Sequence, residues 1–277
     1  EDLGFKVTSF NTSPNKTNVV AQIGPQKDGL ALCGHMDVVP TKGQSWNTDP
    51  FKMHIDAGNL YGRGTCDMKG FFASAMIALK LLPLNKIKKG LSLIWTHDEE
   101  VGCLGAEAFV SQVNASKLLF PEAMLIGEPT DLNICRMHGG HTTLDIDITG
   151  APAHSSKPHL GCSSIEILGE LIMELRQFQI TLAEQPSPHS EMNCVHSLIN
   201  LATVQGGSAV NIIPEHTKLR LGMRPMPGHS SKEMISYIHE RIFYLNKKYP
   251  QASLSMSLLQ DAPPMVTPRG THLEKHL

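Results

Sequence analysis

The sequence lacks three features that would each mark a particular class of protein. It contains no run of about 18 apolar residues, so no membrane-spanning helix is expected. Its 24 Lys and Arg nearly balance its 26 Asp and Glu, whereas a nucleic-acid-binding protein needs a basic surface. None of its 6 cysteines are spaced as CxxC, which argues against a zinc ribbon or a thioredoxin-like motif. We therefore predict a cytoplasmic protein with reduced thiols and with neither nucleic acid nor membrane among its partners.

The 277 residues are enough for two domains, and the first is predicted from alternating strands and helices. The apolar runs predict strands near residues 30–33, 91–96 and 123–126 and a buried helix over residues 71–82. Strands that alternate with helices usually form a parallel sheet covered on both faces. We predict that residues 1–136 form an α/β domain, a mostly parallel sheet with flanking helices.

A different pattern begins near residue 137. Apolar and polar residues alternate as in half-exposed strands, and two further segments have apolar residues at helical spacing. The strand segments are 144–149 and 218–223, and the helical segments are 164–178 and 230–242. Ser230 and Glu233 form a capping-box pattern at the start of the second helix. We predict an inserted α+β domain over residues 137–252, and a return to the first domain over residues 253–277.

Side chains that bind metals lie beside the predicted strand ends of the first domain. They are His35, Asp37, Asp67, Glu99, Glu100 and Glu128. The groups are spaced by roughly one βα unit of about 30 residues, so they are expected to converge at the carboxyl edge of one sheet. Taken singly, each has an ordinary explanation as a surface pair, an N-cap, a solvated face or a turn. The regular spacing favours one shared site.

A divalent cation would explain why so many carboxylates gather in one place. Clustered carboxylates repel one another and resist ionisation, and bound cations remove that repulsion. Two cations bridged by one carboxylate are typical of two-metal hydrolases. Strand alternation places His35 and Asp37 on one side, which suits an imidazole ligand oriented by a carboxylate. One histidine with several carboxylates favours Zn²⁺, with Co²⁺ or Mn²⁺ as alternatives.

Six short motifs occur in a fixed order along the chain. They are LCGHMDVVP, LYGRGTCDMKG, THDEEVG, IGEPT, APAHSSKPHLG and VNIIPEHTKLRLGMRPMPG. This series resembles the M20 metallopeptidase family from about residue 4 to residue 264. The resemblance implies a two-zinc amidohydrolase whose substrate is a small N-acyl amino acid. Within the family, GRGTCDMKGFFA and GEPTDL favour the enzymes that deacetylate N²-acetyl-L-ornithine in arginine biosynthesis over the succinyl-diaminopimelate desuccinylases.

The resemblance also implies which residues hold the metal ions. His35 and Glu128 would bind one zinc, and Asp67 would bridge the two ions. Glu100 would bind the second zinc. The family has one more zinc ligand, a histidine far downstream, and neither His272 nor His276 lies in a matching motif.

The remaining roles implied by the resemblance belong to catalysis. Asp37 would orient His35. Glu99 would be the general base, which takes a proton from the attacking water and returns it to the leaving amine. His154 would stabilise the oxyanion in the active site of a partner subunit, which implies a homodimer. From sequence alone, His154 would instead be an ordinary surface histidine.

Two residues of the second domain match substrate-contacting positions of the family. They are Asn211 and Arg224. The guanidinium of Arg224 could bind the α-carboxylate of an acyl-amino acid through both oxygens. The alternative explanations are a strand-end amide and a surface salt bridge.

The ends of the chain differ from the family pattern. The chain starts at Glu1 and not at Met, so we expect its N-terminus to be incomplete; no secretory signal, counterpart of the family's first helical segment or counterpart of its last zinc-binding histidine is expected within it. We expect this chain to be a fragment that is weakly active or inactive. Three alternatives remain open: a succinyl-diaminopimelate desuccinylase, another N-acyl-amino-acid deacylase, and a non-catalytic remnant that still dimerises. A two-metal phosphatase is disfavoured because no glycine-rich phosphate loop occurs.

Overall fold

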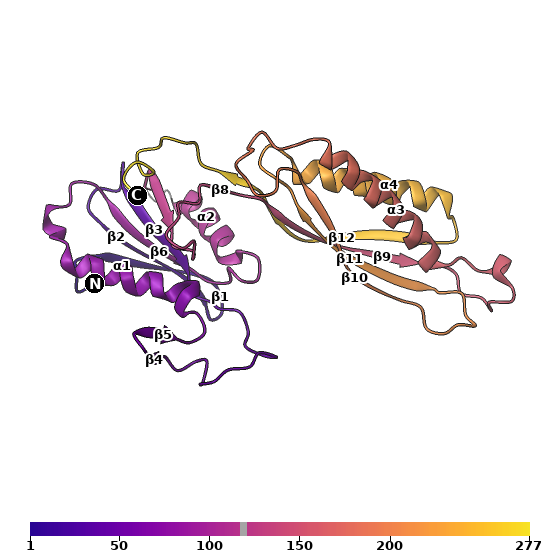
Figure 1. The fold of residues 1–277 in the computed structure, drawn as a ribbon, viewed down its shortest axis with the longest axis horizontal. Helices are drawn as coiled ribbons and strands as arrows, with labels where there is room; N and C mark the ends of the chain where they lie inside the picture. The colour runs from indigo at the N-terminus through magenta and orange to yellow at the C-terminus, as the bar shows by residue number, and fades with distance from the viewer. Residues whose placement is uncertain (117–120) are drawn as a thin grey trace. The chain divides into compact units, whose positions relative to one another are not determined.

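The computed structural model describes residues 1–116 and 121–277, which divide into two compact units (Figure 1). The first unit comprises Glu1–Ile134 and Lys275–Leu277, and the second comprises Cys135–Glu274. Each unit has its own hydrophobic core. Across the described residues, no helix is both long enough and apolar enough to cross a membrane.

The first unit is built on a five-stranded mixed sheet with the strand order β1-β2-β6-β3-β7. The strands are β1 (Lys6–Ser13), β2 (Lys16–Ile23), β3 (Leu30–His35), β6 (Leu91–Thr96) and β7 (Ala123–Ile126). Strands β6, β3 and β7 are parallel, as predicted. The antiparallel β1–β2 hairpin, which extends the sheet beyond β6, was not predicted.

Helices α1 (Gly70–Leu81) and α2 (Leu104–Ser116) cover opposite faces of this sheet. Strand alternation explains the arrangement, because neighbouring residues point to opposite faces. On β6, Ile94 packs with Phe109 of α2, whereas Leu93 packs with Leu79 of α1. The prediction of an α/β domain with flanking helices is therefore confirmed.

Short elements complete the first unit. They are the hairpin of β4 (His54–Asp56) and β5 (Asn59–Tyr61), the short helix η1 (Thr65–Lys69) and the 3-10 turn η2 (Leu84–Lys86). Helix η1 leads directly into α1. It therefore brings Asp67 close to the end of β3, where the side chain contacts His35.

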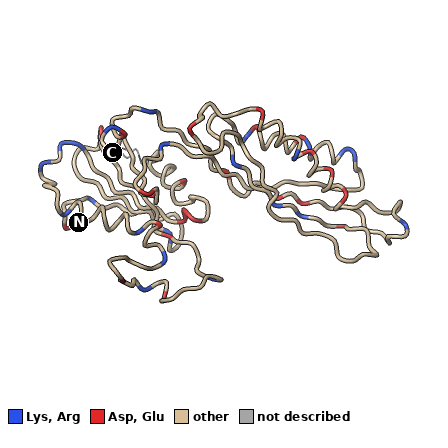
Figure 2. The backbone as a smooth tube through the Cα atoms, in the orientation of Figure 1, with Lys and Arg blue, Asp and Glu red and all other residues tan. Residues whose placement is uncertain are grey.

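The second unit is an antiparallel four-stranded sheet with the order β10-β11-β9-β12. Its main elements are β9 (His141–Thr149), α3 (Ser164–Ala183), β10 (Leu198–Gly206), β11 (His216–Arg224), α4 (Ser231–Lys248) and β12 (Ser253–Ala262). The smaller ones are β8 (Met137–His138), η3 (Pro158–Leu160) and β13 (Met265–Val266). Basic and acidic residues are interspersed along the described backbone of each unit (Figure 2).

Both long helices pack on one face of the second sheet, as predicted. Leu144 pairs with Leu221, and Ile146 pairs with Leu219, so one apolar face is formed by β9 and β11. This face packs against buried leucine and isoleucine residues of α3 and α4, and Leu171 is completely buried there. The α+β prediction is confirmed.

The end of the second unit differs from the boundary that we predicted at residue 252. Strand β12 pairs with β9 along its whole length, so residues 253–262 complete the second sheet and do not start a return to the first unit. Strand β13 then pairs with β8, which keeps the following residues in the second unit. Residues 253–258, with the sequence SLSMSL, alternate polar and apolar residues as the predicted strands 144–149 and 218–223 do, so this strand could have been predicted from the sequence.

Candidate active site

His35 occupies the centre of the candidate site, at the end of β3. It is only 2% exposed. Its Nδ1 lies 2.9 Å from the Asp37 carbonyl oxygen, which can only accept a hydrogen bond. Nδ1 therefore carries a proton, and Nε2 is the nitrogen available to a ligand or a second proton. The buried Met68 side chain packs beneath this position, and its Sδ accepts the His35 N–H.

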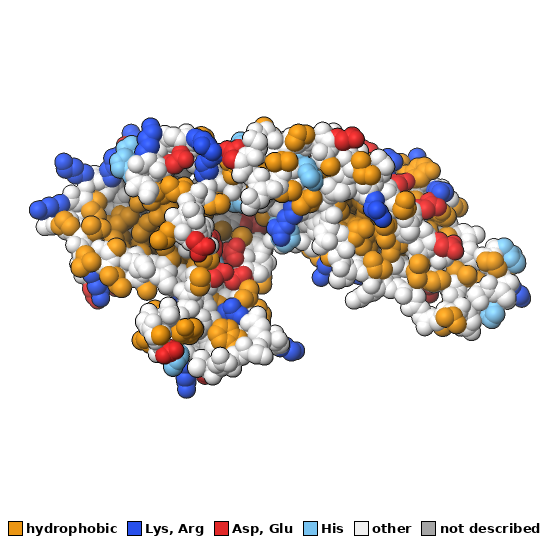
Figure 3. Space-filling view, viewed as in Figure 1, with side chains coloured by type: hydrophobic (Ala, Val, Ile, Leu, Met, Phe, Trp, Pro, Cys, Tyr) orange, Lys and Arg blue, Asp and Glu red, His pale blue; other side chains and the backbone are white. Residues whose placement is uncertain are grey.

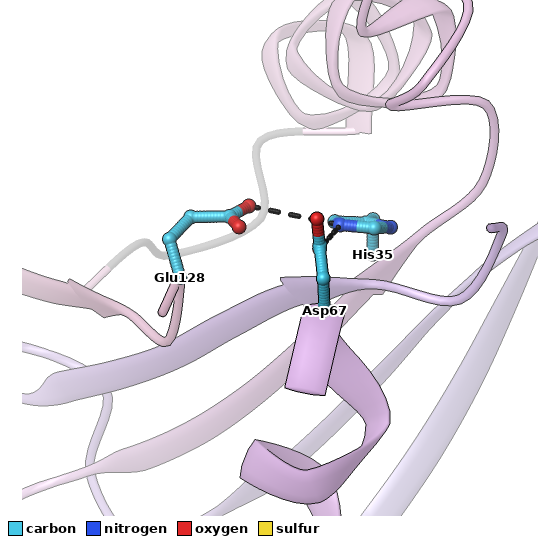
Figure 4. Close-up of side chains that lie close together, drawn as sticks. All are labelled: His35, Asp67 and Glu128. Atoms are coloured by element: carbon cyan, nitrogen blue, oxygen red, sulfur yellow. Dashed lines mark hydrogen bonds and ion pairs between the residues drawn. The ribbon is translucent and has the colours of Figure 1, made fainter. Parts of the chain in front are cut away.

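Two carboxyl groups are directed at the Nε2 side of His35 (Figure 4). Nε2 lies 2.8 Å from Asp67 Oδ1 and 3.7 Å from Glu128 Oε1. A neutral imidazole nitrogen and a carboxylate oxygen are both acceptors, so such a close approach requires a cation between them or a proton on the ring. The geometry suits a metal ion bound by one nitrogen and two oxygens.

Glu99 and Glu100 also face His35. One carboxylate oxygen of Glu99, one of Glu100 and one ring nitrogen of His35 all lie within 4.8 Å of one another. The same is true of one ligand atom each from His35, Asp67 and Glu128. The structure thus brings together all four predicted metal ligands and the predicted base. A group of acidic side chains is visible on this face of the first unit (Figure 3).

The acidic groups shift one another's pKa values. Burial, with repulsion from Asp67 and Glu99, raises the pKa of Glu100. The pKa of Glu128 is raised by burial and by the neighbouring carboxylates, although His35 opposes the shift. The carboxylates of such a cluster repel one another unless a positive charge lies among them, so the residues present fit a divalent cation.

The pKa of His35 is likewise set by burial and by the neighbouring acidic groups, which act in opposite directions. Burial is the largest single influence and lowers it. The hydrogen bonds to Asp67 and to the Asp37 carbonyl, together with nearby Glu128 and Glu99, outweigh burial, so the pKa is raised. Metal binding would displace the proton that these contacts favour.

Asp37 has a more extensive role than orienting His35. Its carboxylate accepts the backbone N–H groups of Glu99 and Glu100, each at 3.0 Å. Its backbone oxygen, rather than its carboxylate, makes the shorter contact to His35 Nδ1, at 2.9 Å against 3.6 Å. Asp37 therefore links the end of β3 to the loop after β6. The sequence predicted only the contact with His35.

A glycine allows Glu128 to approach the site. Gly127 precedes Glu128, and a Cβ there would lie 2.0 Å from Phe71 Cγ. A side chain at this position would push apart the end of β7 and the start of α1. Because Gly127 has no side chain, the Phe71 ring can pack directly against its backbone, and the next residue, Glu128, can lie close to the site.

The three site residues predicted in the second unit fall into two places. His154 is exposed and forms a bridge with Ile212, and the Asn211 carbonyl accepts the Ser155 N–H at 3.0 Å. His154 and Asn211 are therefore neighbours. Arg224 is the last residue of β11, a strand of 9 residues that is roughly 25 Å long, whereas Asn211 precedes the first residue of that strand. The pKa of His141 is lowered mainly by burial of its ring and, to a smaller extent, by the nearby positive charge of Arg224.

The structure gives positioning contacts to polar residues for which the sequence predicted no such role. They are Thr12, Lys16, Asn18, His97 and Asp98, which connect the β1–β2 hairpin to the loop carrying Glu99 and Glu100. Asn18 could have been noticed, because it is a polar residue directly before the apolar pair Val19-Val20. The other contacts depend on strand pairing and have no local signal.

Comparisons with known proteins identify the family of this chain. Residues 31–269 match peptidase family M20/M25/M40. An acetylornithine deacetylase from Buchnera aphidicola subsp. Schizaphis graminum (strain Sg) is 33% identical over all 277 residues, which correspond to 71% of its length.

Two solved structures are similar in fold. One is an M20 family metallo-carboxypeptidase from Sulfolobus solfataricus, with a TM-score of 0.73, 17% identity and coverage of 99% of this chain and 74% of that one. The other is a dinuclear metal binding peptidase of the M20 family from Bacillus subtilis, with a TM-score of 0.60, 17% identity and coverage of 97% and 67%. At these identities the similarity concerns the fold alone.

Proposed function

This chain belongs to peptidase family M20/M25/M40, and on that basis we propose that it is a zinc-dependent amidohydrolase that converts N²-acetyl-L-ornithine to L-ornithine and acetate. The observation that carries the hydrolase assignment is the convergence of His35 with four carboxylates from three separate segments, η1, the loop after β6 and the end of β7. The substrate rests on the deacetylase relative, which matches the whole chain. A cytoplasmic location and Co²⁺ as a second usable metal belong to the same proposal.

Four residues would hold the metal ions. His35 Nε2 and Glu128 would bind one ion, Asp67 would bridge the two, and Glu100 would bind the second. When bound, divalent cations lower the pKa of water and polarise the scissile carbonyl group. The hydrogen bond from Nδ1 to the Asp37 carbonyl keeps Nε2 directed at the acidic groups.

Glu99 would move the proton during the reaction. Its carboxylate is close to His35, and its backbone is fixed by Asp37, so it can stay unligated while Glu100 binds metal. It would take the proton of the attacking water and deliver it to the leaving amine. General acid–base catalysis of this kind contributes about 10²–10⁴-fold.

We further propose that a homodimer completes the active site through the second unit. His154, which is exposed, would stabilise the oxyanion in the partner subunit, and Asn211 beside it would contact the substrate. Arg224 would bind the α-carboxylate of the substrate. Since His154 lies beside Ile212, which precedes β11, and Arg224 ends that strand, a dimer could supply His154 and Arg224 from different subunits.

The test is a comparison of two substrates after the protein is loaded with zinc. We expect release of acetate from N²-acetyl-L-ornithine to exceed hydrolysis of N-succinyl-diaminopimelate by at least about tenfold in kcat/KM, as expected when a site is fitted to one of them. Faster hydrolysis of the succinyl substrate would favour the desuccinylase alternative. Failure to bind zinc tightly, together with no hydrolysis, would favour the non-catalytic remnant.

A further inference from the structure

The loop between β6 and α2 carries Glu99 and Glu100, and the β1–β2 hairpin holds it from the side opposite Asp37. We propose that this hairpin is a positioning device for the two glutamates, acting through Asn18 and through an ion pair between Lys16 and Asp98. The proposal rests on the proposed function, because it assigns the hairpin a purpose in presenting the catalytic base and a metal ligand.

Asn18 spans the two ends of the loop. It is completely buried in β2. Its Oδ1 accepts the His97 N–H at 3.2 Å, and its Nδ2 donates to the Gly105 carbonyl at 2.8 Å. A buried amide with both ends satisfied fixes the separation of the two backbone segments that it joins.

The middle of the loop is held by charge. Asp98 adopts a left-handed backbone with φ of 54°, a conformation that persists only when its surroundings favour it. Its carboxylate contacts Lys16 Nζ at 2.5 Å and His97 Nδ1 at 3.1 Å. Thr12 Oγ1 lies 2.7 Å from Nε2 of the same imidazole. Together with Asn18, the hairpin residues Thr12 and Lys16 thus hold His97 and Asp98, the two residues directly before Glu99.

These contacts act on residues next to the catalytic carboxylate, some through backbone N–H groups and some through side chains. Asp37 fixes the N–H groups of Glu99 and Glu100 from the β3 side, and Lys16 fixes Asp98 from the β2 side. Misplacement of a reacting group by about 1 Å can cost about 10²-fold in rate. Lys16 is 44% exposed, and exposed ion pairs contribute little to global stability, so its loss should affect geometry more than folding.

The experiment compares Lys16→Met with the conservative Lys16→Arg and with Lys6→Met, an exposed lysine on the other strand of the hairpin. In the zinc-loaded full chain we expect Lys16→Met to lower kcat for N²-acetyl-L-ornithine by about tenfold, with KM changed less than about twofold. Lys16→Arg should retain most of the activity, and Lys6→Met should match the parent. Equal kcat in Lys16→Met and Lys6→Met would overturn the proposal.

A second measurement does not need activity. Amide hydrogen exchange of Glu99 and Glu100 in the metal-free chain should accelerate by about fivefold or more in Lys16→Met and stay unchanged in Lys6→Met. Unchanged exchange in both variants would overturn the positioning role. A parent chain that exchanges as expected but hydrolyses nothing would contradict the proposed function and leave the hairpin's hold on the loop supported.

Discussion

At the scale of single residues, the chemistry of the site follows from one protonation state. The Asp37 carbonyl oxygen requires a proton on His35 Nδ1, and this leaves Nε2 facing Asp67 at 2.8 Å. Two acceptors at that distance need positive charge between them. The burial of His35 makes this requirement stronger, since water cannot separate the two groups.

The division of labour between the adjacent glutamates can be tested by substitution. Glu99→Gln should lower kcat by about 10²–10⁴-fold, because a general base is lost, while zinc stoichiometry stays unchanged. Glu100→Gln should lower zinc content as well as rate. Rate measurements and metal analysis on both variants check this, with Glu107→Gln, an exposed first-turn residue of α2, as the control. Loss of zinc in Glu99→Gln would contradict the assignment.

The site residues were predictable to the extent that they follow strand ends. His35, Glu99, Glu100 and Glu128 come together because parallel strands direct their carboxyl ends to one edge, and Asp67 joins them from η1. Partners such as Asn18 for Gly105 could not be predicted, because they are 87 residues apart and depend on pairing between β2 and β6. Local patterns carry no information about such contacts.

At the scale of elements, an aspartate on the predicted wet face of β9 is buried. Asp145 is 3% exposed. Arg220, directly opposite on β11, donates to both of its oxygens at 2.6 and 2.8 Å, and Lys218 lies 2.8 Å away. The alternation of the strand was predicted correctly. The burial arises because two long basic side chains lie over the carboxylate.

This cluster predicts a pH-dependent contribution to stability. Hydrogen bonds from Arg220, then from Lys218, hold the pKa of Asp145 well below its usual range. The folded state therefore binds this proton less readily than the unfolded state, so the stabilisation is complete above about pH 5, begins to fall below about pH 4 and is lost fully only at still lower pH, where the folded carboxyl group protonates. Asp145→Asn should lose about 1–3 kcal/mol at pH 7 and about 1 kcal/mol less than that at pH 3.

Urea unfolding at the two pH values measures this difference. Asp147→Asn is the matched control, because Asp147 lies on the same strand, is 50% exposed and is 3.7 Å from Lys218. It should change stability by less than about 0.5 kcal/mol. A deficit in Asp145→Asn that is as large at pH 3 as at pH 7 would mean that the carboxylate charge is not responsible.

Packing of α3 provides a second test at this scale. Leu171→Ala should cost about 2–5 kcal/mol, since Leu171 is completely buried among β-sheet and helix residues. Met173 is two positions away on the same helix and 65% exposed, so Met173→Ala should change stability by less than about 0.5 kcal/mol. Denaturant unfolding compares the two, and similar losses would show that the helix packs through another face.

Element boundaries were harder to predict than element types. The start of α4 after Ser230 was correct, but Ser230 makes no capping hydrogen bond through its side chain. Instead Ser231 Oγ lies 3.2 Å from an Asp261 carboxylate oxygen on β12. The β1–β2 hairpin was missed because β1, with the sequence KVTSFNTS, is rich in small polar residues and buries little surface. Tertiary contacts decide both cases.

At the scale of the whole molecule, the two units divide the proposed tasks. Every residue of the candidate metal site lies in Glu1–Ile134, whereas His154, Asn211 and Arg224 lie in Cys135–Glu274. The hydrophobic cores of the units contain no common residue. Metal binding should therefore stabilise the first unit directly and leave the internal packing of the second unit unchanged.

Calorimetry with and without a chelator tests this division. Zinc at about 100 times its dissociation constant should stabilise the first unit by about 2.7 kcal/mol for each bound ion, because the ion binds the folded state alone. We expect one thermal transition to move to lower temperature on chelation and a second, assigned to residues 135–274 by Leu171→Ala, to stay in place. His35→Ala should abolish the zinc-dependent shift. A chelator effect of equal size on both transitions would show that the metal ion also stabilises the second unit.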